Sequence, residues 1–122
     1  MKLRIREQSV RFRLSPEDVA SLGRGESVLV SLNLGAEQTF TYGLEMSGTS
    51  LLGVKSVRSG VVIQCPVEML RKLAETDEVG FERVIDLGGE GSVTVLVEKD
   101  FQCLVPRGED DGNTFPNPNA TS

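Results

Sequence analysis

The sequence has no histidine and no tryptophan, and aromatic residues make up only 5% of it. Without histidine, the chain cannot form the Ser-His or Cys-His pairs of hydrolases, a histidine-ligated zinc site or a histidine pH switch. It has only two cysteines, Cys65 and Cys103. Because no export signal precedes them, we interpret both as free thiols. No pair of nucleophile and general base can be named, so we expect no enzyme.

The chain also lacks a long apolar run. No segment approaches the roughly 20 apolar residues that a membrane-spanning helix needs. The alternating basic and apolar residues 2–6 do not form the apolar core of a signal peptide. We therefore expect a soluble, cytoplasmic protein without a membrane partner. A length of 122 residues fits a single domain.

The net charge of −5 is unevenly distributed along the chain. Residues 1–13 contain five basic side chains and one acidic side chain, whereas the remaining residues are strongly acidic. Nucleic-acid-binding domains are usually basic throughout. The overall balance therefore argues against a nucleic-acid partner, and the basic first segment keeps such a partner as an alternative.

Alternation of apolar and polar residues predicts eight β-strands, at residues 2–6, 9–14, 28–34, 40–45, 51–57, 61–65, 79–85 and 93–97. A short helix is predicted after the second strand of each half. Ser15 can cap the first helix, Pro16 suits its first position and Gly23 ends it. The second helix is predicted to begin at Pro66 and to end at Thr76.

Both halves follow the order strand, strand, helix, strand, strand, which predicts an internal duplication of units at residues 1–48 and 49–105. The matched positions are Val10 with Val61, Phe12 with Ile63, Val28 with Val79, and Tyr42 with Val95. The two prolines at the strand-helix corners are one residue out of step with these matches. We predict a mainly β, α+β fold: residues 1–105 form a closed or nearly closed barrel of two ββαββ repeats. The two helices plug its ends.

The pattern changes after the last predicted strand. Three of the five prolines lie in residues 106–122, and residues 107–113 contain no apolar side chain. We predict an extended or disordered acidic tail at residues 106–122.

Two family resemblances add to these patterns. The first concerns the second unit and rests on residues 61–63, Pro66, Glu68, Leu70, Leu73, residues 77–79 and residues 93–97. Through these residues the unit resembles the swapped-hairpin barrels of AbrB-like transcription factors and MazE-type antitoxins. In that family two chains interleave to form one barrel, and some members bind DNA. The resemblance implies that the two units of this chain form the equivalent pseudo-dimer, as a monomer or a weak homodimer.

The whole chain is more closely similar to a family of small bacterial proteins of unknown function. The similar segments are residues 2–14, 74–82, 98–104 and 115–118. This resemblance implies only that the function is uncharacterised.

One candidate interaction face is basic, and it consists of Lys2, Arg4, Arg6, Arg11 and Arg13 on the first predicted hairpin. A β-ribbon can enter the major groove of DNA, and guanidinium groups contact phosphates and guanine. The rest of the chain is acidic, and by alternation no aromatic residue shares this face with the arginines, so we favour a solvated face, or one that holds the acidic tail. The candidate tail contacts are Cys103, Arg107, Glu109, Asp110, Asp111 and Phe115.

Neither a metal nor a cofactor is predicted. The acidic run at residues 109–111 lacks the ligand spacing of an EF-hand. The glycine-rich residues 88–91 lack the Gly-Lys-Ser/Thr ending of a phosphate-binding loop. We therefore expect a non-enzymatic binding or interaction module with an unknown protein partner. The alternative is an AbrB-like DNA-binding regulator that acts through the basic hairpin.

Overall fold

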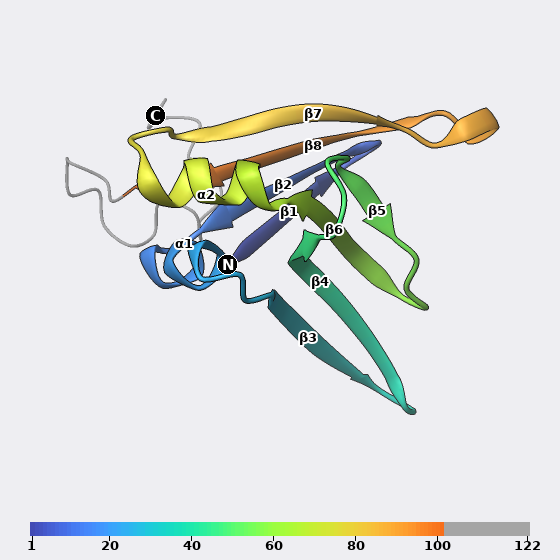
Figure 1. Cartoon of the computed structure of the whole chain (residues 1–122). Helices are drawn as coiled ribbons and strands as arrows, with labels where there is room; N and C mark the ends of the chain where they lie inside the picture. The colour runs from blue at the N-terminus through green and yellow to red at the C-terminus, as the bar shows by residue number, and fades with distance from the viewer. Residues whose placement is uncertain (102–122) are drawn as a thin grey trace, which may run out of the picture.

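The structure, a computed structural model, describes residues 1–101, and the predicted tail at residues 106–122 lies outside them. Its elements are β1 (Lys2–Arg6), β2 (Ser9–Leu14), α1 (Pro16–Gly23), β3 (Val28–Gly35), β4 (Gln38–Ser47), β5 (Gly53–Lys55), β6 (Gly60–Pro66), α2 (Val67–Glu75), β7 (Gly80–Asp86), the 3-10 helix η1 (Gly88–Glu90) and β8 (Ser92–Lys99). The prediction of a mainly β fold with two short helices is confirmed. The fifth strand is shorter than predicted (Figure 1).

The eight strands form two four-stranded sheets with the same plan. Sheet A has the order β1-β2-β8-β7, and sheet B has the order β3-β4-β6-β5. In each sheet, two antiparallel hairpins lie side by side and are joined by a parallel central pair, β2–β8 or β4–β6. Each sheet therefore contains one hairpin from each half of the chain.

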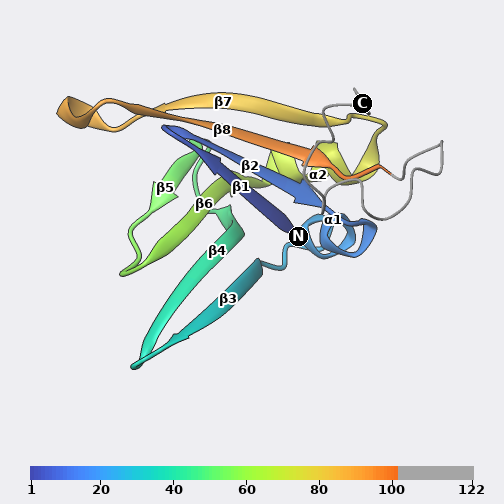
Figure 2. The same ribbon diagram turned by 180° about the vertical axis from the view of Figure 1, so that it is seen from behind.

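The prediction of a closed or nearly closed barrel is wrong. The four central strands pair on both sides, but within residues 1–101 the outer strands β1, β7, β3 and β5 each have only one neighbour. The sheets splay apart on the side away from the helices, so their outer strands do not meet (Figures 1 and 2). The fold therefore has four sheet edges, which a barrel would have removed.

The core lies where the two sheets meet the helices. Alternation along β2 places Val10, Phe12 and Leu14 inside and Arg11 and Arg13 outside. The buried core cluster consists of Val10, Phe12, Leu14, Leu22, Leu44, Ile63, Cys65, Leu70, Leu73, Phe81, Val95 and Val97. Both halves of the chain contribute to this one cluster, so neither half encloses a separate core.

The two helices begin at equivalent positions. Ser15 caps α1, and Pro16 is its first residue, as predicted. Pro66 does not begin α2: it ends β6 in an extended conformation with a ψ of 143° and is the residue before the helix. Ser15 and Pro66 thus hold the same cap position, so the one-residue slip inferred from the two prolines is wrong.

The helices pack against each other at one end of the molecule instead of plugging two ends of a barrel (Figure 1). A Cβ atom added at Gly23 of α1 would lie 2.7 Å from the Cβ atom of Ala74, so glycine permits this close approach. Neither described α-helix has the length and apolar character needed to cross a membrane.

Asp18 stabilises the N-terminus of α1. Its carboxylate accepts a hydrogen bond from the Ser15 N–H at 2.9 Å and lies 2.9 Å from the amino group of Met1. Partial burial raises the pKa of the Asp18 carboxyl, but the bonds from Ser15 and the attraction of the Met1 ammonium group outweigh that effect. The pKa therefore lies below its ordinary value of 3.8.

We expect Asp18→Asn to lower the free energy of unfolding by about 0.5–1 kcal/mol at pH 7, because the charged partner of Met1 is lost. A lowered folded-state pKa stabilises above the unfolded-state pKa, and this contribution is lost as the pH falls through the folded-state value. Denaturation at pH 7 and pH 3 should therefore show a difference from wild type that shrinks at pH 3. Glu17→Gln, an exposed neighbour, is the control, and an equal Asp18→Asn difference at both pH values would contradict this account.

Candidate functional site

The basic residues predicted as an interaction face do lie together. The β1–β2 register pairs Lys2 with Arg13 and Arg4 with Arg11, and Arg6 follows on the same face of β1. Like charges directly opposite each other across two strands are destabilising unless a counter-charge lies nearby. The structure supplies such counter-charges on the neighbouring strand β8 and directly after it.

Glu98 and Asp100 compensate most of this basic face. Glu98 accepts a hydrogen bond from Arg11 Nε at 2.8 Å and another from Arg13 Nε at 3.1 Å. Asp100 lies 2.9 Å from the ammonium group of Lys2 and also contacts Arg13. Among the described residues, Arg4 and Arg6 have no acidic partner. The face therefore has a structural role in joining β1, β2 and β8.

Sheet B has a matching arrangement, which supports this structural role. Glu45 on the central strand β4 accepts a hydrogen bond from Gln64 at 3.0 Å and lies 3.1 Å from the Lys55 ammonium group. The hydrogen bond from Gln64 and the nearby Lys55 lower the pKa of Glu45, although burial opposes them. In both sheets, a carboxylate on one central strand thus accepts a hydrogen bond from a side chain of the other central strand.

Of the two cysteines, only Cys65 lies within the described residues. Cys65 is fully buried at the end of β6, and burial raises the pKa of its thiol to about 12. The thiol is therefore neutral near pH 7 and packs as a small apolar side chain. Cys103 lies outside the described residues, as do the other predicted tail contacts, Arg107, Glu109, Asp110, Asp111 and Phe115.

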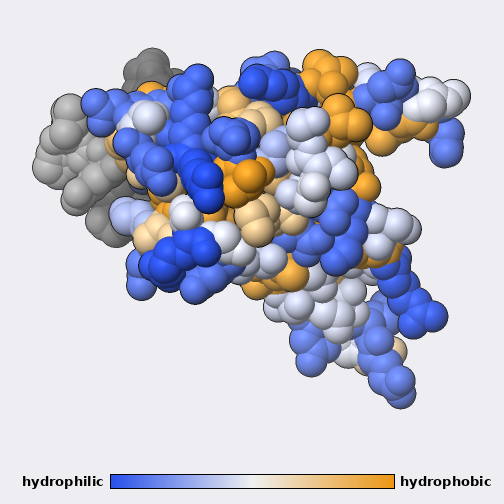
Figure 3. All heavy atoms as spheres, in the orientation of Figure 1, coloured by the Kyte–Doolittle hydropathy of each residue, from blue (hydrophilic) through white to orange (hydrophobic). Residues whose placement is uncertain are grey.

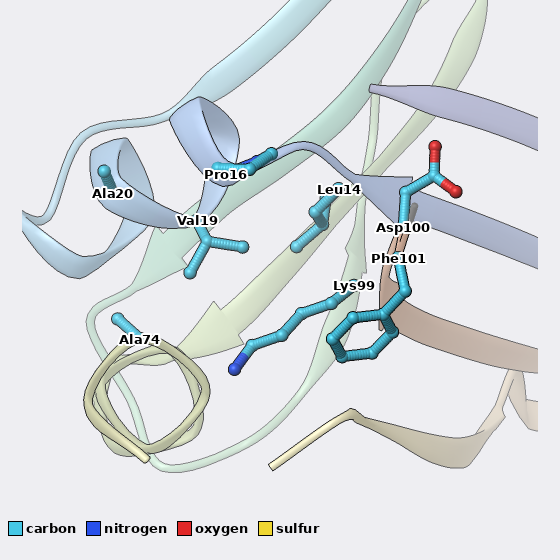
Figure 4. Close-up of a pocket in the computed structure, with 8 residues that line it drawn as sticks. All are labelled: Leu14, Pro16, Val19, Ala20, Ala74, Lys99, Asp100 and Phe101. Atoms are coloured by element: carbon cyan, nitrogen blue, oxygen red, sulfur yellow. The ribbon is translucent and has the colours of Figure 1, made fainter. Parts of the chain in front are cut away.

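A pocket of about 350 Å³ lies between the two helices and the end of β8 (Figure 4). Leu14, Val19 and Phe101 give it a largely apolar lining. Its two charged groups have partners already: Lys99 donates to the Thr76 carbonyl at 3.0 Å, and Asp100 pairs with Lys2. The pocket therefore suits an apolar side chain better than a polar substrate. Sequence reasoning did not predict it, because its lining comes from three separate stretches of the chain, at residues 14–20, residue 74 and residues 99–101.

Within residues 1–101 there is no cluster of three potential metal ligands. Apart from Arg4 and Arg6, the cations of the basic face have acidic partners, and the one described thiol is buried. The surface features that remain are the sheet edges and the exposed apolar side chains.

Three of the four edge strands carry features that discourage pairing with another chain. Charges along an edge and a short strand both have this effect. β1 carries Lys2, Arg4 and Arg6, β7 carries Glu82, Arg83 and Asp86, and β5 has only three residues. These edges are therefore poor templates for a further strand.

β3 is the exception among the four edges. Its eight residues, VLVSLNLG, contain no charge and no proline, and five of them are valine or leucine. Both ribbon views place it at the outer edge of sheet B with β4 as its neighbour (Figures 1 and 2). A long, uncharged and apolar edge is a ready template for strand addition.

The β3–β4 hairpin also exposes apolar side chains on the face that continues the core. Val28 and Leu44 pair inside the core, whereas Val30 pairs with Tyr42 and Leu32 with Phe40 farther out. Leu32 is 54% exposed and Leu34 is 56% exposed. In the space-filling view, hydrophobic surface lies beside the projecting end of the β7–β8 hairpin, whereas the projecting part of sheet B is mostly white and blue on this face (Figure 3).

We call β3, together with the apolar side chains of exposed Leu32 and Leu34 and half-buried Phe40, the β3 site. Sequence reasoning identified this strand but did not single it out, because alternation predicts a strand without telling whether both of its sides are paired. The sequence feature that could have identified it is the absence of charge from residues 28–35. The predicted strands that form the other three edges all contain charged residues.

A model described as a family of unknown function (DUF7009) matches residues 1–119 of the chain. The match confirms the expectation of a family whose function is uncharacterised. No curated protein and no solved structure matches the chain.

Proposed function

We propose that this chain, which belongs to the DUF7009 family of unknown function, is a non-enzymatic interaction module that binds a protein partner through the β3 site. The observation that carries the proposal is the β3 edge, which is eight residues long, apolar and uncharged, beside exposed Leu32 and Leu34. A partner strand added there gains backbone hydrogen bonds from the edge and burial of the leucines.

The charge pattern separates this site from the basic hairpin. β3 and its exposed apolar face present no charged group, so a partner that binds there needs no desolvation of an ion. On sheet A, three of the five cations of the basic face form ion pairs with Glu98 or Asp100. Duplex DNA would have to compete with these carboxylates for most of the basic face, which favours the protein partner over the DNA-binding alternative.

Arg4 and Arg6 are the cations that a DNA-binding alternative would use, because they have no acidic partner within residues 1–101. Binding to duplex DNA at low salt that disappears in the variant Arg4→Glu/Arg6→Glu would revive that alternative. We expect no such binding.

An internal duplication, which we also propose, explains why two sheets share one plan. The pair Val10 and Val95 in sheet A corresponds to Val61 and Tyr42 in sheet B, which agrees with the sequence matches. The match of Val28 with Val79 does not agree with the strand registers. Val28 pairs with Leu44 in sheet B, and the equivalent pair in sheet A is Phe81 with Val97, so Val28 corresponds to Phe81. On this proposal, two residues were gained or lost between the helix and the third strand of one unit.

The test begins with capture of partners from an extract of the source cells and continues with the purified pair. We expect Leu32→Asp to weaken the measured affinity at least about tenfold, because a carboxylate would be buried among apolar groups. Val84→Asp is the matched control: Val84 is 66% exposed on the edge strand β7, and its replacement should leave the affinity unchanged. A partner that binds wild type and Leu32→Asp equally would overturn the proposal.

A further inference from the structure

The order of residues in β3 makes the strand complementary to itself. Val28, Val30 and Leu32 share its inner face, and Leu34 lies at the irregularity between Asn33 and Gly35. In the sequence these four apolar residues lie symmetrically about Ser31. If two copies of β3 pair antiparallel with Ser31 opposite Ser31, then Val28 faces Leu34 and Val30 faces Leu32. A shift of one residue would place these side chains on the opposite face. A shift of two residues would leave Leu34 opposite Glu26 or Val28 opposite Ala36, so the register centred on Ser31 is the one that pairs all four apolar residues with each other.

We propose that the partner at the β3 site is a second copy of this chain, joined by antiparallel pairing of β3 with β3 about Ser31; this inference rests on the proposed function. The pairing is isologous, because each copy offers the same strand. It extends sheet B of one copy into sheet B of the other and gives a continuous sheet of eight strands.

Charge supports a second copy as the occupant. A strand without charge meets no like charge when it pairs with itself, whereas self-pairing of β1 would bring Lys2, Arg4 and Arg6 against a second set of cations. The nearest acids, Glu26 and Glu37, flank β3 and fall opposite residues 36 and 25 in this register, so no carboxylates oppose each other. The apolar surface formed by Leu32, Leu34 and half-buried Phe40 then becomes continuous across the two copies.

Ser31 provides the most direct test, because it lies at the centre of the register. It is exposed on the outer face of β3, where its hydroxyl lies 3.1 Å from that of Thr41. A lysine or glutamate there is tolerated in a single chain, but it would face its own copy across the pairing axis. Like charges so placed disfavour association, whereas opposite charges favour it.

Sedimentation equilibrium of the full chain over a range of concentrations measures this association. We expect wild type to approach twice the mass of one chain as its concentration rises. Ser31→Lys and Ser31→Glu alone should each weaken the dimer at least about tenfold. An equimolar mixture of the two variants should restore a dimer close to wild-type strength. Val84→Lys, on the charged edge strand β7, should dimerise as wild type does.

Two results would overturn the inference. The first is a wild-type chain that stays at the mass of one chain at every concentration, and the second is a mixture of Ser31→Lys and Ser31→Glu that associates no better than either variant alone. Circular dichroism of each variant excludes unfolding as the cause, and restoration in the mixture requires folded chains. If wild type stays monomeric while capture of another protein still depends on Leu32, only the second copy is overturned and the proposed function stands.

Discussion

Replacing Phe12 with alanine is expected to lower the free energy of unfolding by about 3–5 kcal/mol, the range for deleting a buried aromatic ring. Phe12 has no exposed surface and lies on the central strand β2. Its register partners are Leu3 on β1 and Val97 on β8, so its ring packs where the hairpins of the two halves meet. The cavity left by Phe12→Ala would weaken that junction, and denaturant unfolding measures the loss.

Ile5→Ala is the matched control for Phe12→Ala. Ile5 lies on the same hairpin, pairs with Val10 and is 52% exposed. We expect it to cost less than about 1 kcal/mol, because exposed side chains leave no closed cavity. Equal losses for the two variants would mean that the core does not lie between the hairpins of sheet A and the rest of the molecule.

Replacing Gly43 with alanine is expected to cost about 3 kcal/mol or more, because a methyl group has no space there. Gly43 lies on β4 with a φ of +152°, and an added Cβ atom would lie 2.0 Å from the Val28 carbonyl oxygen and 2.9 Å from Leu29 Cα. Both contacts are with the backbone of β3, so β3 would have to move away from sheet B. Thermal unfolding should show a large drop in melting temperature.

Gly53→Ala separates this steric effect from the general effect of removing a strand glycine. Gly53 begins β5, and an added Cβ atom there would meet no atom within 4 Å. We expect Gly53→Ala to change the free energy of unfolding by at most about 1 kcal/mol. Alanine restricts the unfolded chain more than glycine does, and this effect stabilises the fold. A Gly43→Ala variant as stable as Gly53→Ala would contradict the close pairing of β3 with β4.

The secondary structure could be predicted from the sequence because alternation and caps are local. Ser15 and Pro16 mark the start of α1, and alternation along residues 9–14 gives the two faces of β2. The exact start of α2 could not be predicted, because Pro66 suits both the first helical position and the cap before it. The conformation of Pro66 depends on its place in β6, beside Ser47 of β4.

The arrangement of the strands could be predicted only in part. Eight strands and two short helices are compatible with a barrel, but closure depends on whether the outer strands meet, and no local pattern encodes that. The three residues of β5 give little length for such a contact. The sequence match of Val28 with Val79 was wrong for a related reason. Val79 and Phe81 are both apolar, so the sequence alone does not tell which of them corresponds to Val28, whereas the pairing of Phe81 with Val97 does.

The candidate sites show the same limit. The basic face could be predicted from the alternation of Lys2, Arg4 and Arg6 within one hairpin. Its compensation by Glu98 could not, because the parallel pairing of β2 with β8 joins residues more than eighty positions apart. The β3 site became visible only when the unpaired side of that strand was known.

The most direct test of the account is amide hydrogen exchange of residues 28–35 at low and high concentrations of the full chain. Pairing of β3 with a second copy predicts that these amides become more protected as the concentration rises. Amides of the charged edges β1 and β7 should exchange at rates independent of concentration. Protection of residues 28–35 that does not change with concentration, or protection that grows at β1 or β7 instead, would contradict β3 as the surface through which the protein associates.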